Sequence, residues 1–124
     1  MRDGKHVILY VDDDPDALFV VRTVLESAGY AVVEAASAEE GLRVFKQSSP
    51  DLVIVDLMME EVDSGAALAR DLRALGSAVP VYLLSSVGDG LSQTVDVAGL
   101  GLDGVLQKPL APATLLGILA TRLG

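Results

Sequence analysis

Four apolar segments of the sequence end in polar side chains that could carry out chemistry together. Asp56 ends a run of leucine, valine and isoleucine, and the pair Asp12 and Asp13 ends another. Ser85 and Lys108 end two further segments. Because an unpaired charge is costly to bury, these groups are expected at the carboxyl ends of strands, where open α/β sheets place their ligand crevice. The pattern therefore predicts one site built from four strand ends.

The chemistry that suits these residue types is phosphoryl transfer. Three gathered carboxylates repel one another, and a divalent cation with a preference for oxygen ligands, Mg²⁺ or Mn²⁺, removes that repulsion. A bound cation attracts phosphate oxygens, Lys108 adds a positive charge, and a carboxylate can act as nucleophile to form an acyl phosphate. Ser85 offers a hydroxyl donor. Ser86 offers the same group, but strand alternation allows only one of the two to face the site.

The elements that must position these groups alternate regularly along the chain. Apolar runs predict buried strands, and capping residues such as Asp14 before Pro15, or Ser37 with Glu40, predict helix starts. The predicted strands are Val7–Val11, Ala31–Glu34, Leu52–Asp56, Val79–Leu84 and Val105–Gln107. The predicted helices run from Pro15 to a stop at Gly29, from Ser37 to about Gln47, from Asp63–Ser64 to about Leu75, from about Ser92 to Leu100, and from Pro112 onward.

Alternating strands and helices predict an α/β fold with a five-stranded parallel sheet and helices on both faces. The flavodoxin-like strand order 2-1-3-4-5 places the ligand crevice between the first and third strands, which are the strands that end in the aspartates. No linker or repeat interrupts the pattern, so residues 1–124 are expected to form a single domain.

Composition narrows the classes of function. Eighteen acidic and nine basic side chains give a net charge of −9, which argues against nucleic-acid binding by this domain. The absence of cysteine excludes disulfides and thiolate metal sites. The apolar stretch before Asp12 is too short for a signal peptide or a membrane span, so we expect a soluble, cytoplasmic protein without membrane contact.

Four segments together resemble the receiver domain of response regulators from bacterial two-component systems. The resemblance covers the whole chain. The matching segments are Ile8–Asp14, Asp51–Met59, Val79–Ser85 and Gly101–Leu110.

The resemblance implies a role for each candidate residue. Asp56 would be phosphorylated by a sensor histidine kinase, a phosphotransfer protein or a small phosphodonor, and Ser85 and Lys108 would contact the phosphoryl group. The domain would assist its own phosphorylation and dephosphorylation without being an enzyme in its own right. The groups implied to hold Mg²⁺ are Asp12, Asp13, Asp56 and the backbone carbonyl of Met58. The fourth helix, fifth strand and fifth helix would bind a downstream partner or a second copy.

Two of the departures from the family pattern, at Val105 and Met58, bear on how the domain would work. Val105 stands where receiver domains usually carry Tyr or Phe, and valine has no ring to reorient on activation. We therefore expect a signal to travel through the segment 87–91, and a phosphorylation-independent docking module remains the alternative. A phosphatase or phosphomutase would need a second acid at Met58, so that class is disfavoured. The apolar Met58 side chain also predicts slow self-dephosphorylation.

Overall fold

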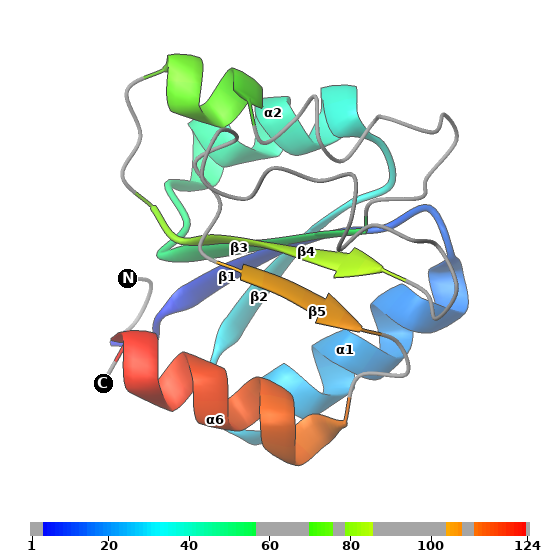
Figure 1. Ribbon diagram of the computed structural model, residues 1–124, viewed down its shortest axis with the longest axis vertical. Helices are drawn as coiled ribbons and strands as arrows, with labels where there is room; N and C mark the ends of the chain where they lie inside the picture. Colours follow the sequence, from blue (N-terminus) through cyan, green and yellow to red (C-terminus); the bar gives the residue numbers. More distant parts are fainter. Residues whose placement is uncertain (1–3, 57–69, 76–78, 86–103, 108–110, 124) are drawn as a thin grey trace.

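A computed structural model describes residues 4–56, 70–75, 79–85, 104–107 and 111–123 (Figure 1). Residues 70–74 are also helical. The elements follow one another as β1 (Val7–Val11), α1 (Pro15–Ser27), β2 (Ala31–Ala35), α2 (Ala38–Ser48), β3 (Leu52–Asp56), β4 (Val81–Ser85), β5 (Gly104–Gln107) and α6 (Pro112–Leu123).

The strands form a parallel sheet in the order β2-β1-β3-β4-β5. In β1 and β3 every residue is buried, as expected for strands covered on both faces. The predicted α/β fold with a parallel sheet is therefore confirmed. The backbone of β5 pairs with β4 at one edge of the sheet.

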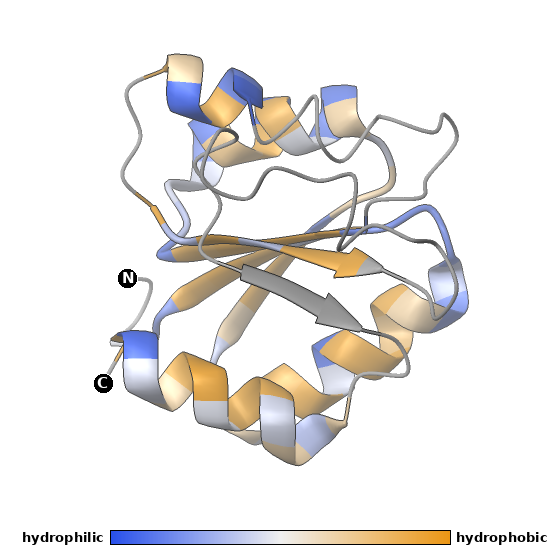
Figure 2. Ribbon diagram, viewed as in Figure 1, coloured by the Kyte–Doolittle hydropathy of each residue, from blue (hydrophilic) through white to orange (hydrophobic). Residues whose placement is uncertain are grey.

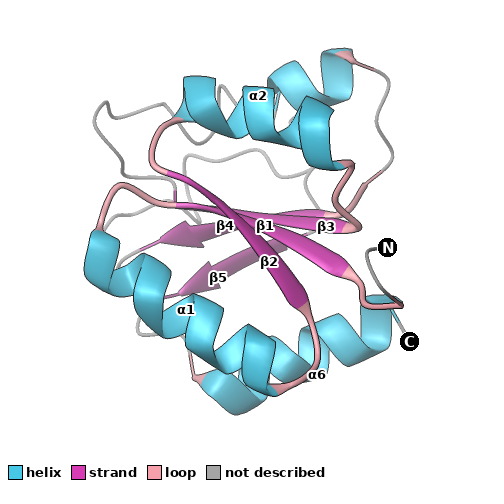
Figure 3. Cartoon of the chain, turned by 180° about the vertical axis from the view of Figure 1, so that it is seen from behind, coloured by secondary structure: helices cyan, strands magenta, loops and turns pink. Residues whose placement is uncertain are grey.

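Helices cover both faces of this sheet (Figures 1 and 3). On one side lie α2 and the helical residues 70–74, and on the other lie α1 and α6. Figure 2 shows the apolar colouring concentrated on the central strands and on the helices that pack against them. In the described part of the chain, no helix combines the length and apolar character that crossing a bilayer requires.

The alternation of side chains along each strand divides the core into two clusters. The α2-side core consists of Leu9, Val11, Ala35, Val53, Val55, Leu72, Val81 and Leu83. The α1-side core consists of Ile8, Tyr10, Val21, Leu25, Leu52, Ile54, Tyr82, Leu84, Leu115 and Leu119. Neighbouring residues of one strand thus pack against helices on opposite faces of the sheet, and this packing fixes the orientation of the strand ends.

The predicted helix caps are confirmed. The Asp14 side chain accepts a hydrogen bond from the backbone N–H of Asp16 at the start of α1, and Ser37 accepts one from Glu40 at the start of α2. Gly29, two residues after α1 ends, has a φ of 94°, a conformation that glycine adopts without the strain a Cβ would cause.

Three strands differ from the prediction in their bounds. β2 ends one residue later, at Ala35, and β5 begins one residue earlier, at Gly104. We expected the fourth strand over Val79–Leu84, whereas β4 covers Val81–Ser85. Pro80 has no N–H to contribute to the ladder, although its carbonyl accepts a hydrogen bond from the backbone of Val53 at 2.9 Å. The predicted helix over 92–100 and the segment 87–91 lie outside the described residues.

The α2-side core makes a testable contribution to stability through Leu83, at the centre of β4. Its side chain is fully buried, so Leu83→Ala leaves a cavity and should lower the free energy of unfolding by about 2–5 kcal/mol. The matched control is Leu75→Ala, since Leu75 is 50% exposed and its truncation should cost no more than about 0.5 kcal/mol. Urea unfolding of both variants measures the difference; equal losses would contradict this view of the core.

Candidate functional site

The register of β1 and β3 brings two aspartates side by side. Val11 pairs with Val55 across these strands, so the next residues, Asp12 and Asp56, are adjacent at the carboxyl edge of the sheet. The backbone N–H of Asp12 donates to the carbonyl of Ala35 at 3.0 Å, which keeps the chain in line one residue beyond β1. The sheet itself therefore fixes the spacing of the two acids.

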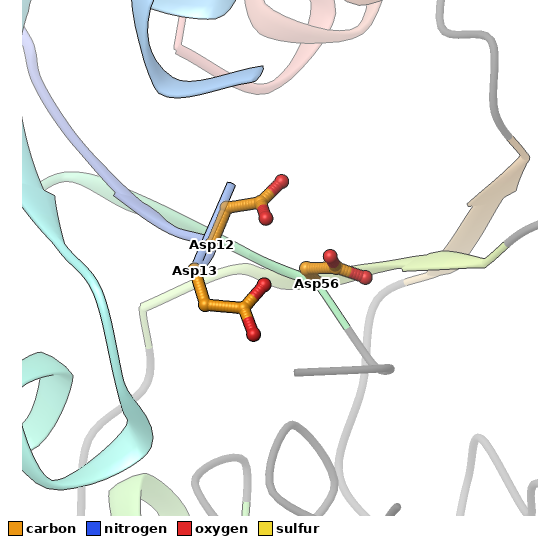
Figure 4. Close-up of side chains that lie close together, drawn as sticks. All are labelled: Asp12, Asp13 and Asp56. Atoms are coloured by element: carbon orange, nitrogen blue, oxygen red, sulfur yellow. The ribbon is translucent and has the colours of Figure 1, made fainter. Parts of the chain in front are cut away.

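Asp13 completes the cluster from the other side of the strand end. In Figure 4 the side chains of Asp12 and Asp13 leave the chain on opposite sides, and Asp56 lies beside them at the end of β3. One carboxylate oxygen from each residue can be chosen such that all three lie within 4.8 Å of one another. Asp12 and Asp56 are 0% and 4% exposed, whereas Asp13 is exposed. The predicted gathering of the three acids is thus confirmed.

Among the described residues, Tyr10 and Asp14 each donate a hydrogen bond to the buried Asp12 carboxylate. The hydroxyl of Tyr10 donates to Asp12 Oδ2 at 2.6 Å, and the backbone N–H of Asp14 donates to Asp12 Oδ1 at 3.0 Å. The side chain of Asp14 faces the first turn of α1, where it accepts from Asp16. Asp14 is therefore a helix cap that also supplies a backbone donor to the site. Each Asp12 oxygen has its own donor, which offsets part of the cost of burying this charge.

Tyr10 was not singled out from the sequence, although its spacing from Asp12 indicates that the two side chains are neighbours. Tyr10 and Asp12 are two residues apart on one strand, so their side chains lie on the same face. Burial raises the pKa of Tyr10 far above its ordinary value, and the hydrogen bond to Asp12 and the negative charges of Asp12, Asp56 and Asp14 raise it further. The hydroxyl is consequently a neutral donor across the ordinary pH range.

The cluster has the donor chemistry of a site for a hard cation. It offers carboxylate oxygens alone, and the chain contains no thiolate that would favour a softer metal. Asp12, Asp13 and Asp56 could hold a divalent cation, and the exposure of Asp13 leaves the cluster accessible from solvent. A divalent cation would offset two of the three negative charges that the fold brings together.

The remaining predicted site residues are described only in part. Asp56 pairs with Leu84 across β3 and β4, so the backbone of Ser85 stands one residue further along, at the end of β4. Its side chain is not among those described. Lys108 and Met58 lie outside the described residues. Their expected contacts therefore stay predictions.

The raised pKa of Tyr10 has a measurable consequence at alkaline pH. Because the pKa is higher in the folded chain than the unfolded value of about 10, the stability that Tyr10 contributes is complete below pH 10 and is lost as the pH rises towards the folded value. In an absorbance titration with metal chelated, one of the three tyrosines should ionise only as the protein unfolds.

The variants identify the tyrosine concerned. Tyr10→Phe should abolish the delayed component and remove this contribution to the loss of stability at high pH, while Tyr82→Phe should retain both. Ionisation of every tyrosine in the folded protein would contradict the burial and hydrogen bonding of Tyr10.

Comparison with known proteins gives a consistent result. Residues 8–120 match the response regulator receiver domain family. The probable transcriptional regulator ycf27 of Porphyridium aerugineum is 37% identical over 111 residues, which make up 90% of this chain and 45% of that protein. The chain thus spans less than half the length of this relative.

Solved structures agree in fold. A CheY-like receiver domain protein of Methanospirillum hungatei superimposes with a TM-score of 0.87 at 28% identity, covering 97% of this chain and 94% of that one. The BeF₃-activated N-terminal receiver domain of Klebsiella pneumoniae RstA gives a TM-score of 0.83 at 28% identity, covering 95% and 98%. The chain belongs to the response regulator receiver domain family of two-component signalling.

Proposed function

We propose that this domain is a phosphorylation-dependent switch in which Asp56 accepts a phosphoryl group in a Mg²⁺-dependent reaction. The observation that carries the proposal is the convergence of Asp12, Asp13 and Asp56 at the carboxyl edge of the sheet. Two of these acids are buried, a costly arrangement that a structural role alone does not require. In this proposal, residues 1–124 form a single receiver domain.

Asp56 is the nucleophile in this proposal. A carboxylate oxygen of Asp56 attacks the phosphorus of the donor, so a P–O bond forms as the donor's P–N or P–O bond breaks. The leaving imidazole or carboxylate keeps the electron pair of the broken bond. Asp56 ends β3 at the carboxyl edge of the sheet, where open α/β folds place their ligand crevice, and it is 4% exposed, which limits its orientations.

The other residues of the proposed site bind the cation or contact the phosphoryl oxygens. Asp12, Asp13 and Asp56 would hold Mg²⁺, or Mn²⁺ in its place, together with the backbone carbonyl of Met58. The ion, when bound, neutralises charge on the phosphoryl oxygens. Lys108 places its ammonium group against a phosphoryl oxygen and Ser85 donates its hydroxyl. Similarity to a receiver domain activated by BeF₃ supports the presence of such a phosphoryl site.

The partners follow from the family. The donor is a sensor histidine kinase or a phosphotransfer protein in the cytoplasm. The response is altered binding of a downstream partner, or self-association, through the surface around β5 and α6 and the segment that precedes β5. Curated relatives are named as transcriptional regulators, which supports a regulatory output for the protein that contains this domain.

Asp56→Asn provides the direct test of the phosphoacceptor. Incubation with acetyl phosphate and Mg²⁺ should add the mass of one phosphoryl group to the wild-type chain, and the variant should show less than about a hundredth of that labelling, since an amide is a poor nucleophile. Intact-protein mass spectrometry measures the product. Asp16→Asn, an exposed acid at the start of α1, is the matched control and should be labelled as the wild type is.

Two results would contradict the proposal. Equal labelling of Asp56→Asn would place the phosphoryl group elsewhere. No labelling of the wild type, combined with an unchanged pattern of amide shifts on adding beryllofluoride, would favour the phosphorylation-independent docking module.

The metal requirement is tested through Asp13, the exposed acid of the cluster. Chelation with EDTA should abolish labelling of the wild type. Asp13→Asn should weaken Mg²⁺ affinity by about 10–100-fold in calorimetry, because one of three charged ligands is lost. Since Asp13 is exposed, the variant should keep its thermal stability. Metal binding as tight as in the wild type would remove Asp13 from the site.

A further inference from the structure

The hydrogen bond between Tyr10 and Asp12 connects the acid cluster to the α1-side core. Tyr10 is 1% exposed, and its ring packs among the apolar residues of that core. Its hydroxyl reaches past the core to Asp12 Oδ2 at 2.6 Å, a short distance that is typical of an O–H group donating to a carboxylate. A buried ring with few alternative rotamers therefore holds one oxygen of a buried acid.

The second oxygen of Asp12 is held independently. The backbone N–H of Asp14 donates to Oδ1 at 3.0 Å, and Asp14 is itself fixed as the cap of α1. Because the two donors bind different oxygens, they define the plane of the Asp12 carboxylate. Each carboxylate oxygen has two lone pairs, so accepting one of these hydrogen bonds does not prevent an oxygen from also binding a cation.

A neutral donor suits this position better than a charged one. A lysine or arginine against Asp12 would neutralise the charge that attracts a cation, whereas the tyrosine hydroxyl stabilises the carboxylate and adds no charge. Phenylalanine would fill the same space without donating. Asp12 would then be buried beside Asp13 and Asp56 with one donor fewer, and its orientation would be less restricted.

We propose that Tyr10 is a positioning residue for the metal site, whose hydroxyl orients the Asp12 carboxylate for binding of a divalent cation. The inference rests on the proposed function, because it presumes that the cluster of Asp12, Asp13 and Asp56 binds Mg²⁺. Tyr10 acts through Asp12 and does not itself touch the ion. Removing such a supporting hydrogen bond around a metal site typically weakens metal affinity by about 10–100-fold.

The first experiment compares metal affinity in matched variants of the full chain. Isothermal titration with MgCl₂ should give a dissociation constant about tenfold weaker for Tyr10→Phe than for the wild type. Tyr82→Phe is the control, since Tyr82 is buried in the same α1-side core, on β4. Its dissociation constant should stay within twofold of the wild-type value. Circular dichroism verifies that both variants are folded.

The second experiment reads the hydrogen bond directly and leaves Tyr10 in place. The chain has no tryptophan and three tyrosines, so in the double variant Tyr30→Phe, Tyr82→Phe the only tyrosine is Tyr10. A cation bound to Asp12 would draw electron density from the carboxylate oxygens and so weaken the hydrogen bond that Asp12 Oδ2 accepts from the Tyr10 hydroxyl. The near-ultraviolet difference spectrum of this variant should therefore change with Mg²⁺ and saturate at the calorimetric dissociation constant.

The outcomes separate this inference from the function on which it rests. If the wild type binds Mg²⁺ and Tyr10→Phe binds it equally well, Tyr10 has no positioning role and the metal site stands. If Mg²⁺ binds without any change in the Tyr10 spectrum, the coupling through Asp12 is wrong. If the wild type does not bind Mg²⁺, the proposed function fails and this inference fails with it.

Discussion

The parallel pairing of β1 with β3 is the constraint on which the rest of the structure depends. It sets Val11 opposite Val55 and so places Asp12 beside Asp56 at the edge of the sheet. Helices on both faces bury the side chains of these two strands, and this apolar burial offsets the cost of two enclosed carboxylates. The same backbone pairing therefore contributes to the stability of the sheet and places two acids of the candidate site side by side.

Most of the fold could be predicted because the local signals agree with one another. Apolar runs marked the strands, Asp14 and Ser37 marked helix starts, and Gly29 marked a helix end, each for a reason that depends on neighbours in the sequence. The fourth strand was misplaced by two residues at its start. There the apolar pattern continued through Pro80, while the hydrogen-bond ladder could not.

The three acids of the candidate site were predicted from the sequence, but the hydrogen bond from Tyr10 that holds one of them was not. Asp12, Asp13 and Asp56 are conspicuous because acids seldom follow buried strands, and parallel topology brings their strand ends together. Tyr10 was predicted only as part of the buried strand Val7–Val11, and its ring does pack in the core. Strand alternation places the side chains of Tyr10 and Asp12 on one face, and the structure adds that the hydroxyl reaches the carboxylate. The ring of a tyrosine packs with apolar residues while its hydroxyl binds a polar group, and an apolar sequence pattern detects only the ring.

Strand alternation has a consequence for how this part of the sequence can change over time. Tyr10 and Asp12 share one face of β1, whereas Leu9, Val11 and the exit towards Asp13 belong to the other. Substitutions at single positions alter one face at a time, but insertion or deletion of one residue within β1 exchanges the two faces for every residue beyond it. The length of this strand is therefore under tighter constraint than its composition, since a single step in register would turn Tyr10 and Asp12 away from the α1-side core and change how Asp12 meets Asp56.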